Sequence, residues 1–109
     1  MRQSEPAELL RVYISESDRY QGKPLHEAIV AKCRELKIAG ASVFAGREGY
    51  GETAELHRPH VVHRDCPIVV MVIDRADKIR ALVPEIERML DTGLIATSAV
   101  QMLRVEKAV

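Results

Sequence analysis

Aromatic residues and charge of one sign are what this sequence has least of. The 109 residues include three tyrosines, one phenylalanine and no tryptophan, so the core must be built from aliphatic side chains. Sixteen Lys and Arg residues balance sixteen Asp and Glu residues. A protein that binds duplex nucleic acid usually carries a basic surplus or a basic stripe. The balance therefore argues against nucleic acid as a partner.

Long apolar runs are also missing. No run approaches the roughly 18 residues of a membrane-spanning helix, and the opening MRQSEPAELL lacks the apolar stretch of a signal peptide. The two cysteines, Cys33 and Cys66, form no recognisable disulfide framework. These features predict a cytoplasmic protein with reduced thiols and no membrane insertion.

Asparagine is absent altogether. Acylphosphatase-type chemistry needs an arginine and an asparagine placed together, so the sequence argues against that reaction. No order of Ser, His and Asp, or of Cys and His, stands out as typical of nucleophilic catalysis. We find no catalytic constellation and expect that the protein is not an enzyme.

The apolar pattern predicts four strands and two helices. The expected strands are residues 9–14, 41–45 and 67–73, with a last strand or pair of short strands from residue 94; the expected helices are residues 24–37 and a segment between Asp74, as its cap, and Gly93. A long loop, about residues 46–66, joins the second and third strands. The order β-α-β-β-α-β predicts an α+β, ferredoxin-like fold, a four-stranded antiparallel sheet with two helices on one face. Residues 1–109 are expected to form a single domain.

One face of the predicted sheet has no helix to cover it. The run from Ile68 to Ile73 is nevertheless apolar on both faces. Leu9, Tyr13 and Phe44 are also expected to point away from the helices. An apolar face of this size is an association surface. We therefore expect other copies of the same chain to bury this face, with their sheets facing inward.

Glycines mark the first half of the long loop. Gly46, Gly49 and Gly51 bracket Tyr50, and Arg47 lies among them. Glycines let the backbone approach a ligand closely, and successive exposed N–H groups can form a concavity that binds an anion. The alternative interpretation is a bent strand end with a β-bulge.

Histidines mark the second half of the loop. His57, His60 and His63 are spaced three residues apart, and Cys66 follows three residues later. Imidazole and thiolate groups are suitable ligands for zinc or copper. Pro59 interrupts any helix that would bring them together, and solvated loop histidines are the alternative interpretation. A metal site at the three histidines is kept as a second hypothesis.

The start of the first helix offers another place for an anion. Lys23 directly precedes this start, where backbone N–H groups and the helix dipole favour a phosphate. Arg19 lies four residues earlier and is a second candidate phosphate ligand. The alternative interpretation is an ordinary loop with a solvated lysine.

Three stretches of the sequence carry a family resemblance: ESDRYQGKPLHEAI, IAGASVFAGREGYG and Leu56–His57. Together they resemble the PII-like family known as domain of unknown function 190, over about residues 8 to 105. More loosely, Gly40, Val43 and the Gly49-Tyr50-Gly51 triplet are similar to PII signalling proteins. The resemblance implies a ferredoxin-like trimer that binds nucleotides in clefts between subunits and reaches partner proteins with its long loop.

One segment departs from the PII pattern. PII proteins carry a second phosphate loop, with glycines and a lysine, between the last helix and the last strand. Here only Thr92 and Gly93 match its start, within DTGLIATSAV. The resemblance therefore favours an adenine nucleotide that is smaller than ATP or differently held, or another metabolite.

The residues and the resemblance together predict a trimeric regulatory protein with a small effector, expected to be an adenine nucleotide. Its partner would be a transporter or an enzyme, contacted through the long loop. The candidate effector-binding residues are Arg19, Lys23, Arg47, Gly49, Tyr50 and Gly51. The alternative function is a divalent metal-binding trimer, similar to the copper-tolerance proteins, that uses His57, His60 and His63.

Overall fold

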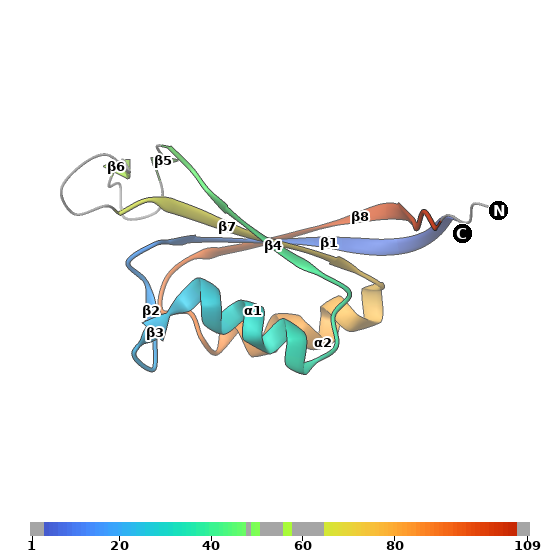
Figure 1. The fold of residues 1–109 in the computed structure, drawn as a ribbon, viewed down its shortest axis with the longest axis horizontal. Helices are drawn as coiled ribbons and strands as arrows, with labels where there is room; N and C mark the ends of the chain where they lie inside the picture. The colour runs from blue at the N-terminus through green and yellow to red at the C-terminus, as the bar shows by residue number, and fades with distance from the viewer. Residues whose placement is uncertain (1–3, 48, 51–55, 58–64, 107–109) are drawn as a thin grey trace.

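The helices and strands follow the predicted order, with two short hairpins added. The computed structural model describes residues 4–47, 49–50, 56–57 and 65–106 (Figure 1). The elements are β1 (Ser4–Ser15), β2 (Arg19–Tyr20), β3 (Lys23–Pro24), α1 (Leu25–Glu35), β4 (Ala41–Ala45), β5 (Gly49–Tyr50), β6 (Leu56–His57), β7 (Pro67–Asp74), α2 (Ala76–Glu87) and β8 (Leu94–Leu103). The four long strands form one antiparallel sheet in the order β4-β7-β1-β8. Both helices cover the same face of it (Figure 1), so the ferredoxin-like prediction is confirmed.

The core lies between the sheet and the helices and is aliphatic, as the composition predicts. Leu10 and Val12 of β1 are fully buried, and so are Ile29 of α1 and Ile79 and Leu82 of α2. Alternate residues of a strand point to opposite faces, so the odd-numbered residues of β1 point away from the helices. The predicted division of β1 into two faces is therefore confirmed.

The first helix begins and ends one or two residues inside the predicted range. Pro24 is its N-cap, with a φ of −55° and a ψ of 130°, and the helix begins at Leu25. At the other end Lys37 has a φ of 58°, and the N–H of Ile38 donates to the carbonyl of Cys33 over 2.9 Å. This is the geometry of a Schellman ending. The left-handed residue is therefore a lysine, and not a glycine.

Asp74 has a different role from the predicted helix cap. The N-cap of α2 is Arg75, and no side-chain hydrogen bond caps that helix. Asp74 is 4 % exposed. Its carboxylate accepts one hydrogen bond from the N–H of Ala39 at 2.9 Å and another from the N–H of Arg75 at 2.7 Å. The buried carboxylate thus joins the α1–β4 connection to the start of α2.

The first strand is longer than predicted, and the last strand is continuous. β1 begins at Ser4, and β8 is one continuous strand rather than a pair of short ones. The pairing of β1 with β8 extends to Ser4 and Leu103, whereas its pairing with β7 stops at Glu8. A two-stranded ribbon therefore extends past the helices, at the end of the molecule opposite β5 and β6 (Figure 1). Within the described ranges, neither helix is long and apolar enough to cross a membrane.

Burial of Cys33 in the core predicts a specific loss of stability in alkaline solution. Burial raises the pKa of the Cys33 thiol from 9.0 to about 11. Between these values the unfolded chain releases a proton that the folded chain retains, so stability falls as the pH rises. We expect Cys33 to contribute a loss of about 2–3 kcal/mol between pH 9 and pH 11. Urea unfolding at several pH values should show a shallower alkaline decline for Cys33→Ala; equal declines would contradict the prediction.

Candidate functional site

Both ends of the long loop are anchored to the sheet at one end of the molecule. After β4, the N–H of Gly46 donates to the carbonyl oxygen of Pro67 over 2.7 Å. Before β7, Cys66 is buried, and its carbonyl oxygen accepts a hydrogen bond from the N–H of Glu16 at 2.8 Å. The sheet and the β1–β2 turn therefore hold the base of the loop in place.

The base of the loop requires glycine at position 46, because there is no space for a side chain beside Pro67. A Cβ atom added there would lie 2.8 Å from Cγ of Pro67, which is too close for two carbon atoms. We expect Gly46→Ala to reduce the free energy of unfolding by about 1–3 kcal/mol, the range for inserting a methyl group into packed structure. Gly40→Ala is the matched control, because a Cβ atom at Gly40 has no neighbour within 4 Å. Urea unfolding measures both, and equal stabilities would contradict the prediction.

Above the base, the two arms of the loop pair with each other. Gly49 pairs with His57, and Tyr50 pairs with Leu56, in a two-stranded antiparallel ladder of β5 and β6. Two of the three predicted loop glycines, Gly46 and Gly49, therefore lie next to the sheet and in this ladder. The pairing was not predicted, because two-residue strands are too short to show a periodic pattern.

The metal hypothesis and one effector residue fall mostly outside the described residues. Three of these residues lie outside the described ranges: Gly51, His60 and His63. His57 is described only as a member of β6. Within the described ranges, no group of three or more His, Cys, Asp or Glu side chains is placed to hold a metal ion. The roles proposed for these four residues therefore stay predictions.

Lys23 and Arg19 lie on a tight hairpin before α1. Tyr20 pairs with Lys23, and Arg19 pairs with Pro24. The two turn residues between these strands, Gln21 and Gly22, have φ values of 51° and 81°, as a type I′ turn requires. The hairpin fixes Lys23 at the start of the helix, where the sequence predicted an anion site.

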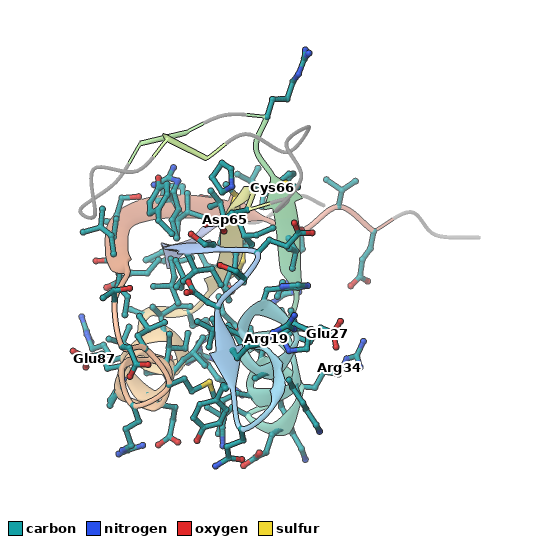
Figure 2. The ribbon with its side chains drawn as sticks, turned by 90° about the vertical axis from the view of Figure 1, so that its left-hand side faces the viewer. Arg19, Glu27, Arg34, Asp65, Cys66 and Glu87 are labelled. Carbon is teal, nitrogen blue, oxygen red and sulfur yellow. The ribbon has the colours of Figure 1, made fainter. Side chains whose placement is uncertain are left out.

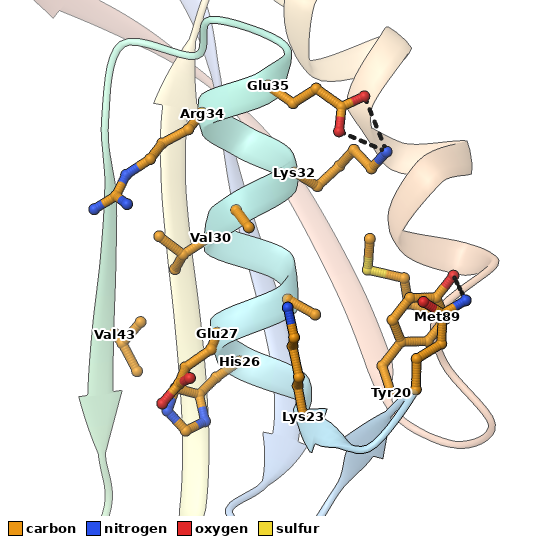
Figure 3. A pocket seen from close by; sticks show the side chains of 13 residues that line it. Tyr20, Lys23, His26, Glu27, Val30, Lys32, Arg34, Glu35, Val43 and Met89 are labelled. Carbon is orange, nitrogen blue, oxygen red and sulfur yellow. Dashed lines mark hydrogen bonds and ion pairs between the residues drawn. The ribbon is translucent and has the colours of Figure 1, made fainter.

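Lys23 lines an open groove of about 610 Å³ along the outside of α1. On the side that faces β4, the groove is lined by His26, Val30, Arg34 and Val43 (Figure 3). The three helical residues are spaced four apart, so they occupy one face of α1. The sequence analysis missed them, although this spacing was a signal that could have identified the face.

Charges of both signs line the β4 side of the groove, from Glu27 and Arg34 (Figure 3). Nδ1 of His26 is buried and has no hydrogen-bond partner among the described residues. On the side toward α2, Nζ of Lys32 lies 3.2 Å from Oε1 of Glu35 and forms an ion pair with it (Figure 3). Arg34 forms no ion pair within the described part of the chain. Glu27 is the acidic residue on this side of the helix (Figure 3). Arg34 is therefore the residue of this side that can contact an anionic group.

The predicted effector residues form two groups that one chain does not bring together. Lys23 and Arg19 belong to the β2–β3 hairpin, on the helix side of the sheet, whereas Arg47, Gly49 and Tyr50 belong to the loop on the other side (Figures 1 and 2). Both groups lie at the same end of the long axis (Figure 1). A ligand that contacts both groups would therefore need more than one chain.

The connection between α2 and β8 lies at the same end of the molecule as the β2–β3 hairpin (Figure 1). α2 ends at Glu87, and β8 begins at Leu94, directly after Gly93. Gly93 has a φ of 147°, and a Cβ atom there would lie 3.1 Å from the carbonyl oxygen of Tyr13. The close packing of this turn against β1 therefore explains why a glycine is found at position 93.

Comparison with known families identifies the chain. The family model of DUF190, described as "Uncharacterized ACR, COG1993", matches residues 7–102. The chain belongs to the DUF190 family. Among curated proteins, this DUF190 chain is 33 % identical over 97 residues to a UPF0166 protein of Aquifex aeolicus, covering 87 % of this chain and 91 % of the relative. It is 26 % identical over 94 residues to a UPF0166 protein of Methanocaldococcus jannaschii, covering 82 % and 84 %.

Solved structures confirm the PII-like fold of this DUF190 chain. CPII of Thiomonas intermedia K12, a nitrogen regulatory PII-like protein, matches with a TM-score of 0.69 at 14 % identity, over 94 % of this chain and 92 % of CPII. A putative PII-like signalling protein of Thermus thermophilus matches with a TM-score of 0.60 at 14 % identity, over 94 % and 92 %. The divalent ion tolerance protein CutA1 of Ehrlichia chaffeensis gives 0.58 at 20 % identity, over 84 % and 78 %.

Proposed function

We propose that this DUF190 chain is a cytoplasmic, non-enzymatic regulator of the PII-like type. It binds an adenine nucleotide in clefts between the subunits of a homotrimer and acts on a partner protein through residues 46–66. The observation that carries the proposal is the match to CPII over nearly the whole chain, because the CPII structure contains ADP, AMP and bicarbonate. The two separated groups of effector residues support a cleft that is shared between chains.

The edges of the sheet support assembly into a ring. Within the described residues, β4 and β8 are the edge strands, and neither ASVFA nor LIATSAVQML contains a charged residue or a proline. Charges and prolines are the usual protection of an edge strand against pairing. β4 and β8 run in opposite directions. The β8 edge of one copy can therefore join the β4 edge of the next copy and continue an antiparallel sheet.

The face without helices supports the same arrangement. Tyr13, Phe44, Ile73 and Leu94 lie on this face and are between 37 % and 53 % exposed in the single chain. A ring of three copies related by rotation about an axis along the strands would turn these side chains inward and leave the helices outside. Such head-to-tail contacts form a closed ring when repeating the rotation from one copy to the next returns to the first copy.

Isothermal titration with ADP, AMP and ATP tests the proposed effector. We expect ADP or AMP to bind, with at most one nucleotide per chain, and ATP to bind more weakly because the α2–β8 connection lacks the second phosphate loop. Bicarbonate should be added in parallel titrations, because CPII binds bicarbonate as well as ADP. If none of the three nucleotides binds with or without bicarbonate, the nucleotide part of the proposal is wrong.

A divalent metal-binding trimer is the second candidate function. Its support is the similarity to CutA1, a divalent ion tolerance protein, together with His57, His60 and His63 of the loop. Metal analysis of protein purified without a histidine tag separates the two candidates. Bound zinc or copper at one ion per chain would favour it, whereas traces of metal would eliminate it.

A further inference from the structure

Arg11 occupies an unusual position in the sheet. It lies in the middle of β1, between Leu9 and Tyr13 on the face that no helix covers, and it is half-buried in the single chain. Its neighbours across the sheet are Met71 of β7 and Ala96 of β8. Directly opposite residues in an antiparallel sheet have their Cβ atoms only about 5 Å apart. The guanidinium group therefore emerges from apolar surroundings.

No acidic residue on this face of the four-stranded part can neutralise Arg11. The other residues of this face are Leu9, Tyr13, Ser15, Ser42, Phe44, Pro67, Val69, Met71, Ile73, Leu94, Ala96 and Ser98. Glu8 lies on the opposite face, where Arg80 is 3.9 Å away. Glu5 shares the parity of Arg11, but six residues of extended strand separate them by about 20 Å. Among the described residues Arg11 has no hydrogen bond or ion pair.

The proposed ring would bring the Arg11 side chains together. Rotation about an axis along the strands keeps every Arg11 at the same height, on the inward-facing side of each sheet. An unpaired buried charge is strongly unfavourable, and several like charges in one apolar interior are worse. The four-stranded part of this face contains no other charged residue that could compensate for them.

We propose that the Arg11 side chains of the assembled copies bind a small oxyanion with at least two negative charges, on or near the rotation axis. The proposal rests on the trimer of the proposed function. The planar guanidinium group suits this ligand because its N–H groups match two oxygen atoms of an oxyanion at once. The site differs from the nucleotide clefts, since it lies inside the ring and uses a residue from the middle of β1.

The test measures the assembly constant at increasing concentrations of inorganic phosphate, and separately of sulfate, with sodium chloride keeping the ionic strength constant. Sedimentation equilibrium gives the assembly constant of the full chain. Because one anion binds per assembled ring, linkage predicts an increase of about tenfold for each tenfold increase in anion above its dissociation constant. Arg11→Met should assemble without phosphate and show no dependence on it. Arg75→Met is the control for general ionic effects, because Arg75 is the N-cap of α2 and is 67 % exposed. It should behave like wild type.

Each result has a separate meaning. If wild type forms the ring but its assembly constant does not change with phosphate or sulfate, the proposal is wrong and the trimer still stands. An anion dependence that persists in Arg11→Met also overturns it, because the anion then binds elsewhere. A wild-type chain that stays monomeric at every phosphate concentration overturns the trimer of the proposed function, and the Arg11 site with it.

Discussion

Met71→Lys should give a folded monomer, whereas Val70→Asp should give a chain that does not fold. The two residues are neighbours on β7 but point to opposite faces. Val70 is fully buried under the helices and pairs with Val12 and Val43. Met71 pairs with Arg11 on the face that no helix covers. Met71→Lys places a second cation opposite Arg11, and Val70→Asp places a carboxylate among the apolar side chains of the core. Burial of an unpaired charge costs several kcal/mol, so the first change disrupts assembly and the second disrupts the core.

Circular dichroism and sedimentation velocity on the same samples distinguish the two effects. Met71→Leu is the control, because it keeps an apolar side chain of similar volume, and it should assemble like wild type. A wild-type monomer at micromolar concentration, or a Met71→Lys variant that still forms trimers, would show that this face is not the interface. A folded Val70→Asp variant would contradict the assignment of the core.

Lys23→Ala and Arg47→Ala should each weaken nucleotide binding, and a mixture of the two variants should recover part of it. The loss of one charge-assisted contact is expected to cost roughly 1–3 kcal/mol. Lys23 and Arg47 lie on opposite sides of the sheet at the same end of the chain (Figure 1). If one cleft takes Lys23 from one copy and Arg47 from the next, random mixing of the two variants restores about a quarter of the clefts to wild type.

The measurement is a titration of the refolded equimolar mixture with the nucleotide that binds wild type. A fraction of sites with wild-type affinity is the expected result. The control is the double variant, which cannot form a wild-type cleft with itself and should show none. Unchanged affinity in both single variants would place the effector elsewhere, and the groove of His26 and Arg34 beside α1 would then be the next region to test.

Periodic apolar patterns made most of the fold predictable from the sequence. Leu10, Val12 and Ile14 alternate with outward-facing residues, and this alternation correctly identified both faces of β1. Phe44 was also expected to point away from the helices, and it lies on that face and is 53 % exposed. These predictions succeeded because burial acts on every second residue of a strand and so leaves a regular signal.

Features that depend on one contact were not predictable in the same way. The buried role of Asp74 depends on the N–H of Ala39, which lies 35 residues earlier, and no local pattern indicates that contact. The left-handed Lys37 contradicts the usual preference for glycine at a helix end. In the candidate site, the sequence around His26 and Arg34 is typical of a solvated helix face. Only the position of β4 beside α1 turns that face into a groove.

The anchored base of the long loop has a consequence for how proteins of this type can diverge. The hydrogen bonds of Gly46 with Pro67 and of Glu16 with Cys66 close the loop at the edge of the sheet. Segments inserted beyond this closure leave the core contacts unchanged. Doubling the length of a flexible loop adds only about 0.6 kcal/mol of closure entropy. Evolution or protein engineering can therefore exchange the loop as a module, while the scaffold that carries it stays the same.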